Sequence, residues 1–136
     1  AELEAACARF AAMRISEDAL AELRIANELC QHAVDARDSD GYYRENERFH
    51  AILYKQSGNS FLEQESKRLH RRLMPFRRLQ LRVRGRLRQS MAEHEAIVQA
   101  LEAGDAAAAA EATRAHVAVQ GEKFNNLMAS LKPAAE

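Results

Sequence analysis

The sequence predicts an all-α fold, an antiparallel bundle of six or seven helices around a central ligand or metal pocket. The 136-residue chain contains only two prolines and five glycines. Its apolar residues recur at intervals of three and four, and no segment shows the alternation of a strand. With 47% hydrophobic and 29% charged residues, the chain has the composition of one globular domain, which we assign to residues 1–136.

Capping residues and turns predict the helix boundaries in order. Ser16 precedes two acidic residues and caps a second helix. The turn 57–60 begins the fourth helix, Gly85 interrupts the chain after it, Gly104 ends the fifth helix, and Asp105 caps the sixth. The expected helices are therefore 2–13, 17–37, 39–56, about 60–83 with Pro75 inside it, 87–103 and 106–131.

Membrane and secreted proteins are disfavoured by composition. No stretch approaches the roughly 20 consecutive apolar residues of a membrane-spanning helix, and no secretory signal opens the chain. Cys7 and Cys30 lack the neighbours of a disulfide framework or a thiolate zinc site. We therefore expect a cytoplasmic protein. Because the chain begins at Ala1 without an initiator methionine, we also expect a piece of something longer.

Positive charge is concentrated in one segment although the net charge is zero. Between Ser66 and Ala92 there is no Asp or Glu, and this segment holds ten of the twenty Lys and Arg residues. Such a block could bind nucleic acid, attract a small anion or pair with the acidic remainder, and a solvated helix face explains it equally well. Direct nucleic-acid binding is the weakest alternative, because only Phe76 interleaves an aromatic ring.

Polar residues interrupt the apolar stripes of three predicted helices. Asn46 and His50 lie one turn apart on the third stripe, and His94 and His116 lie within the fifth and sixth. His32 and His70 lie off the stripes of their own helices. The stripes comprise Tyr43, Asn46, His50 and Leu53; Leu62, Ser66, Leu69, Leu73 and Phe76; Leu87, Met91, His94, Val98 and Leu101; and Ala109, Ala112, His116 and Val119.

Four inward polar residues on three helices suggest a shared partner. Any one of these histidines alone is explained by a hydrogen bond to a neighbour in the core. Together, Asn46, His50, His94 and His116 could hold one divalent ion such as zinc, nickel or manganese, since neutral imidazole and an amide oxygen are suitable ligands.

A carboxylate-bridged di-metal enzyme is disfavoured. Glu47 and His50 form one Glu-x-x-His motif, but Met91 and Thr113 stand three positions before the other two histidines. The sequence also lacks HExxH, a P-loop, a GxGxxG turn and a nucleophile elbow, so we do not expect an enzyme. A stand-alone histidine-ligated metalloprotein, with or without catalysis, stays open as the alternative.

Six short motifs follow one another along almost the whole chain. They are Leu3–Ala12 (LEAACARFAA), Asn46–His50 (NERFH), Ser57–Asn59 (SGN), Glu93–Ile97 (EHEAI), Ala100–Asp105 (ALEAGD) and His116. Their order and spacing resemble the C-terminal effector-binding (FCD) domain of the FadR-like GntR transcription regulators. The resemblance implies a homodimeric helical bundle that binds a small organic acid, often through a metal, and controls an N-terminal winged-helix DNA-binding domain. That domain is not in this sequence.

The resemblance also implies functional residues. The family's metal ligands match Asn46, His50, His94 and His116, the four residues of the stripes, although Asp is commoner at the first position. An amide there leaves every protein ligand neutral, so an anionic effector should be favoured more strongly. Family arginines on the fourth helix line the effector pocket, and the matching candidates are Arg77 and Arg78, whose planar forks suit a carboxylate. We expect the remaining arginines at solvent, dimer or interdomain contacts.

Overall fold

The computed structural model describes the backbone of residues 1–131 and the side chains of residues 1–118 and 126. All described regular structure is helical, which confirms the predicted all-α class. The six helices are α1 (Glu2–Arg14), α2 (Glu17–Asp35), α3 (Ser39–Gln56), α4 (Ser60–Leu81), α5 (Arg86–Glu102) and α6 (Ala106–Leu131). Residues 132–136 and the side chain of Val119 lie outside the described part.

The predicted caps form as hydrogen bonds. Ser16 Oγ accepts from the amide of Ala19 at 3.2 Å, and Asp105 Oδ1 accepts from the amide of Ala108 at 2.9 Å. Gly104 ends α5 with a φ of 64°, and Gly85 precedes α5 with a φ of 79°. Both angles lie in the left-handed region that glycine adopts most easily, which is why the chain turns at these two positions.

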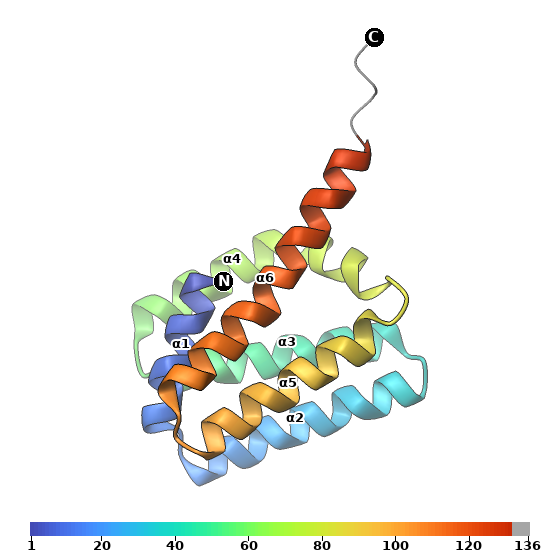
Figure 1. Cartoon of the computed structure of the whole chain (residues 1–136). Helices are drawn as coiled ribbons and strands as arrows, with labels where there is room; N and C mark the ends of the chain where they lie inside the picture. The colour runs from blue at the N-terminus through green and yellow to red at the C-terminus, as the bar shows by residue number, and fades with distance from the viewer. Residues whose placement is uncertain (132–136) are drawn as a thin grey trace.

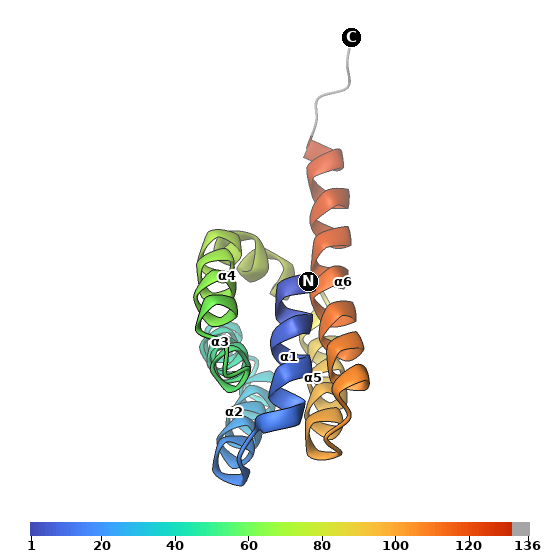
Figure 2. The same ribbon diagram turned by 90° about the vertical axis from the view of Figure 1, so that its left-hand side faces the viewer.

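The helices form two layers with α1 between them. In Figure 2, α2, α3 and α4 lie on one side and α5 and α6 on the other, while α1 packs against both α3 and α6. Figure 1 shows the C-terminal part of α6 extending beyond the other helices. None of the helices, within the described residues, is long and apolar enough to span a bilayer.

The main hydrophobic core lies where α1 meets the other helices. Small residues of α1, among them Ala8 and Ala11, pack against larger ones such as Leu23, Phe49 and Ile97. Because alanine has no bulk beyond Cβ, α1 approaches its neighbours closely. The histidine-bearing segments of α3, α5 and α6 therefore lie beside the core in the interior of the bundle.

Helix α4 corrects the predicted stripe. Leu69, Leu73 and Phe76 are 37%, 43% and 39% exposed, and the helix instead buries its polar face. The buried residues are Ser66, His70, Arg77, Gln80 and Leu81. Ser66 of the predicted stripe is buried, but beyond it the predicted face was wrong, because the polar side chains of α4 find hydrogen-bonding and charged partners inside the bundle.

The predicted stripe of α5 is displaced by one residue at its start. Leu87 and Met91 are only partly buried, whereas Arg86 and Ser90 are fully buried. His94, Val98 and Leu101 are buried as expected. Arg86 is therefore an interior residue, which corrects the expectation that it lies at solvent or at a domain contact.

Candidate metal centre

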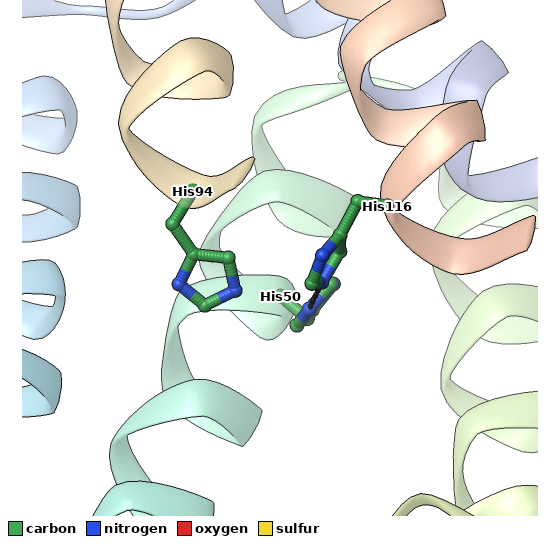
Figure 3. Close-up of side chains that lie close together, drawn as sticks. All are labelled: His50, His94 and His116. Atoms are coloured by element: carbon green, nitrogen blue, oxygen red, sulfur yellow. Dashed lines mark hydrogen bonds between the residues drawn. The ribbon is translucent and has the colours of Figure 1, made fainter. Parts of the chain in front are cut away.

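Three imidazoles converge in the interior of the bundle. His50 on α3, His94 on α5 and His116 on α6 are fully buried, and one ring nitrogen from each lies within 4.8 Å of the others. Figure 3 shows the three rings pointing toward one another from their separate helices. The structure thus brings together three of the four residues that the interrupted stripes selected.

Asn46, the fourth of these residues, lies one turn before His50 on α3. Its side chain is buried, and Oδ1 has no hydrogen-bond partner among the described residues. A buried amide oxygen without a partner is unfavourable unless another ligand satisfies it. Asn46 therefore has an oxygen available to a cation.

Two carboxylates fix the orientation of two of the rings. The Nδ1 of His50 lies 2.8 Å from Oε2 of Glu4, and the Nδ1 of His116 lies 2.6 Å from Oε2 of Glu93. An ionised carboxylate only accepts, so each Nδ1 carries the proton and each Nε2 presents a lone pair. The two Nε2 atoms are 3.2 Å apart, so either a proton shared between them or a cation beside them satisfies both lone pairs.

His94 completes the set as a neutral imidazole. Burial holds its pKa well below the ordinary value, and the nearby His116, His50 and Arg86 lower it further. Neither ring nitrogen has a hydrogen-bond partner within the described part of the chain. The ring stacks on Phe49 with centroids 4.1 Å apart. A neutral ring with an available nitrogen, held by stacking, is suited to ligation.

An arginine supports each of the two carboxylates. Arg77 Nη2 donates to Oε1 of Glu4 at 2.5 Å, and Arg86 Nη2 donates to Oε2 of Glu93 at 2.8 Å. Burial raises the pKa of Glu4, but Arg77 and His50 outweigh it and leave that pKa well below the ordinary value. The pKa of Glu93 is also lowered, because hydrogen bonds from His116 and Arg86 outweigh its burial. Both carboxylates are therefore ionised at neutral pH.

His70 on α4 extends this network. Its position off the predicted apolar stripe placed it outside the buried face of α4, but the side chain is buried. Its Nδ1 accepts from Arg77 Nη1 at 2.8 Å and lies 3.3 Å from the hydroxyl of Tyr54. Burial, then the charge of Arg77, lowers the pKa of His70 to about 3. His70 is thus a neutral acceptor for Arg77, while the other off-stripe histidine, His32, is exposed.

The two predicted effector arginines lie in different surroundings. Arg77 is buried and ion-paired to Glu4. Because Glu4 also contacts His50, this carboxylate links Arg77 to the histidines. Arg78 is exposed, lies 3.2 Å from Asp40 and covers the ring of Tyr43. The histidine network thus includes Arg77, whereas the contacts of Arg78 are at the surface. An effector role for either residue stays a prediction.

Sequence reasoning missed Glu4, Glu93 and Arg86 as parts of the site. A sequence indication existed for Glu4, because it precedes Ala8 and Ala11 at helical spacing and so falls on the buried face of α1. Arg86 had no such indication. Its neighbour Leu87 fits an apolar stripe better, and nine other basic residues surround it in the sequence.

The residues present fit a divalent cation. Two Nε2 atoms face each other, a third imidazole and an amide oxygen lack hydrogen-bond partners among the described residues, and none of the four side chains is a carboxylate or a thiolate. The carboxylates on the far nitrogens of His50 and His116 are the partners that metal-bound histidines ordinarily have. A cation here would satisfy groups that are otherwise unfavourably buried.

Comparisons with known proteins place this chain in a family. A family model described as the FCD domain matches residues 1–119. Two solved structures share the fold. E. coli McbR/YncC has a TM-score of 0.76 at 22% identity over 90% of this chain, and Streptococcus agalactiae GntR has a TM-score of 0.65 at 24% identity over 86%. This chain spans 64% and 52% of their respective lengths, and a comparison with curated proteins gave no match. The match of the family model over most of the chain shows that it belongs to the FCD domain family, as its motifs indicated.

Proposed function

We propose that this domain is the sensing module of a transcription regulator. It binds a small organic acid at a divalent metal ion held by Asn46, His50, His94 and His116, and thereby controls DNA binding by a separate N-terminal domain. The observation that supports this most strongly is the pair of Nε2 lone pairs 3.2 Å apart, each fixed by a carboxylate on Nδ1.

Family membership supports a regulatory, effector-binding domain. The chain matches the FCD model, and one of the similar solved structures is named a GntR protein. Those structures are longer than this chain, so contact with DNA through a further domain is part of the proposal. No catalytic motif accompanies the histidines, which favours a sensor over the alternative of a metalloenzyme.

The charges of the site favour an anionic effector. The ion pairs Arg77–Glu4 and Arg86–Glu93 each have no net charge. The four proposed ligands are also neutral. When bound, a divalent metal would supply two uncompensated positive charges and a Lewis acid for an effector oxygen. A carboxylate compensates that charge in a buried place, whereas a neutral sugar or an amine does not.

Arg77 and Arg78 are the proposed effector arginines from the resemblance. Arg77 is the better placed of the two, because it is buried and its fork reaches the Glu4 that orients His50. We propose that it holds Glu4 charged and contributes positive potential to the effector. Arg78 would serve only an effector that extends to the surface beside Tyr43.

The metal is tested by elemental analysis of protein purified without a chelator and without a histidine tag. We expect up to one zinc, nickel or manganese ion per chain, and a sharp decrease in His94→Ala and in His116→Ala. Each substitution removes one ligand of the set. The proposal is wrong if both variants retain the metal content of the wild type.

His32→Ala is the matched control. It also removes one imidazole, but His32 is exposed on α2 and lies away from the converging rings. Its metal content should equal that of the wild type. A decrease in this variant as large as in His94→Ala would indicate adventitious surface binding.

A further inference from the structure

Among the side chains that the structure describes, Arg86 is the largest that is fully buried. It occupies the first position of α5, directly after Gly85, and only 1% of its surface is exposed. Arginine remains charged at every physiological pH, and a guanidinium carries five N–H donors. A charge buried in this way requires acceptors around it.

Only part of the guanidinium is engaged. Nη2 donates to Oε2 of Glu93 at 2.8 Å, whereas neither Nε nor Nη1 has a hydrogen-bond partner among the described residues. Three N–H bonds therefore point into the interior without an acceptor. Glu93 balances the charge of Arg86 but engages only one nitrogen of its fork, and the same oxygen also accepts from His116.

Further donors lie in the same region. Ser90 is one turn after Arg86 on the same face of α5, and its hydroxyl is fully buried. The hydroxyl of Tyr42 is equally buried, and within the described residues the two hydroxyls have no hydrogen-bond partner other than each other. Burial raises the pKa of Tyr42, and the hydrogen bond with Ser90 and the charge of Arg86 partly oppose the rise. Arg86, Ser90 and Tyr42 thus form one group of buried donors.

This donor group adjoins the three histidines. Oε2 of Glu93 joins Arg86 Nη2 at 2.8 Å to His116 Nδ1 at 2.6 Å. The ring of Tyr42 is stacked toward His94, with centroids 6.5 Å apart and planes 15° apart. The donors are therefore linked to the proposed metal ligands through the carboxylate of Glu93 and the ring of Tyr42.

We propose that Arg86, with Ser90 and Tyr42, is an anion-binding subsite of the effector pocket and selects organic acids that carry two carboxylates. One carboxylate binds at the metal, and the other accepts hydrogen bonds from Arg86. This inference rests on the proposed function and extends it, since it names the class of acid and assigns the second carboxylate to a residue of α5. An acid with one carboxylate reaches either the metal or the unpaired donors of Arg86, but not both.

The test measures binding of malonate, succinate and acetate to the metal-loaded chain by calorimetry, in the wild type and in Arg86→Gln and Arg86→Lys. We expect the better of the two dicarboxylates to bind more tightly than acetate, and to lose about tenfold to hundredfold in affinity in Arg86→Gln. Arg86→Lys should recover part of the loss, because it retains the charge but not the fork. Acetate should lose much less affinity than the dicarboxylate in either variant, since Arg86 reaches the proposed metal site only through Glu93 and His116.

Metal content and melting temperature without acid are measured for each variant, so that this inference and the proposed function fail separately. Metal retained and dicarboxylate affinity unchanged in Arg86→Gln would overturn the subsite and leave metal sensing intact. Equal loss of acetate and dicarboxylate affinity would also overturn it.

Arg88→Gln, at an exposed arginine two positions away, is the control and should bind all three acids as the wild type does. If Arg86→Gln does not fold, Ser90→Ala takes its place and should weaken the dicarboxylate selectively; no change would again contradict the subsite.

Discussion

Three histidines of this domain, His70, His94 and His116, are held neutral by their surroundings. Burial is the first cause in each case, lowering the pKa of His116 to about 4 and that of His70 to about 3, and holding that of His94 well below its ordinary value. A neutral ring can ligate a metal or accept a hydrogen bond from arginine, and a protonated ring can do neither. The same burial that prepares the site thus makes the metal-free fold sensitive to acid.

The direction of that sensitivity follows from proton linkage. An imidazole with a depressed pKa takes up its proton in the unfolded chain first, near pH 6.5. The free energy of unfolding therefore falls as the pH decreases below about 6.5, and the loss ends near the folded-state pKa. Glu4, whose pKa is also lowered, adds a loss in the same direction, but only below its ordinary value of 4.5.

We predict that His70→Gln reduces the pH dependence of stability in the metal-free domain. Between pH 6 and pH 5, each buried neutral histidine contributes roughly 1.4 kcal/mol per pH unit, and the variant should lose one such contribution. Urea unfolding in the presence of a chelator measures the slope. His32→Gln, at an exposed position, should leave the slope unchanged. An equal slope in wild type and His70→Gln would show that His70 is protonated in the folded state.

At this scale, the sequence predicted the convergence of His50, His94 and His116 but not the residues that support them. Asn46 and His50 could be found because they share one short stripe, and His94 and His116 because each interrupts an apolar row. Glu4 contacts His50 and Arg77 across 46 and 73 positions of sequence. Such pairings depend on how the helices pack, which the periodicity of a single helix does not reveal.

Among the helices, α4 departs most from expectation, because its polar face is buried and its apolar face is exposed. Its inward face carries Ser66, His70 and Arg77, whose partners lie in the interior. Its outward face carries an apolar row, comprising Phe61, Leu69, Leu73, Phe76 and Leu79, which Val83 extends just after the helix; each is at least 37% exposed. A continuous apolar row on a helix surface is typical of an interaction site. We propose that this row is the homodimer interface that the family resemblance implies.

The dimer prediction is tested with Leu73→Glu. In a two-fold interface the change occurs twice, and loss of roughly 2 kcal/mol of burial per copy should raise the dimer dissociation constant about hundredfold or more. Sedimentation velocity at micromolar concentration distinguishes dimer from monomer. Ile25→Glu on α2, where Ile25 is also exposed at 48%, is the matched control and should remain dimeric. A wild type that is monomeric, or a Leu73→Glu variant as dimeric as the control, contradicts this interface.

For the whole molecule, helix number and caps were predictable, whereas the layering was not. Ser16, Asp105 and the left-handed glycines act locally, so their effect is visible in the sequence. The position of α1 between the layers depends on small residues such as Ala8 and Ala11 allowing close approach to several helices. The layering matters for function, because it brings Glu4 of α1 against His50 of α3 in the interior.

This architecture couples effector binding to the stability of the entire bundle. The proposed ligands come from α3, α5 and α6, and the supporting charges come from α1, α4 and α5. An acid that binds only when these helices are assembled stabilises the folded state by mass action. At a hundredfold excess over its dissociation constant, the stabilisation is roughly 2.7 kcal/mol, which is measurable as a rise in melting temperature.

We therefore predict that the metal-loaded domain is stabilised by malonate but not by malonamide, its neutral analogue of similar size. A chelator should abolish the effect, because the charge that attracts the anion is then absent. His50→Ala should weaken it strongly and Arg77→Lys more modestly, since the latter keeps the charge beside Glu4. Arg78→Ala, at an exposed position, tests the other predicted effector arginine, and unchanged stabilisation would remove it from the site. Equal stabilisation by malonamide, or a malonate effect that persists with chelator and in His50→Ala, would mean that the bundle responds to something other than an anion at a metal. The histidines would then serve the core alone.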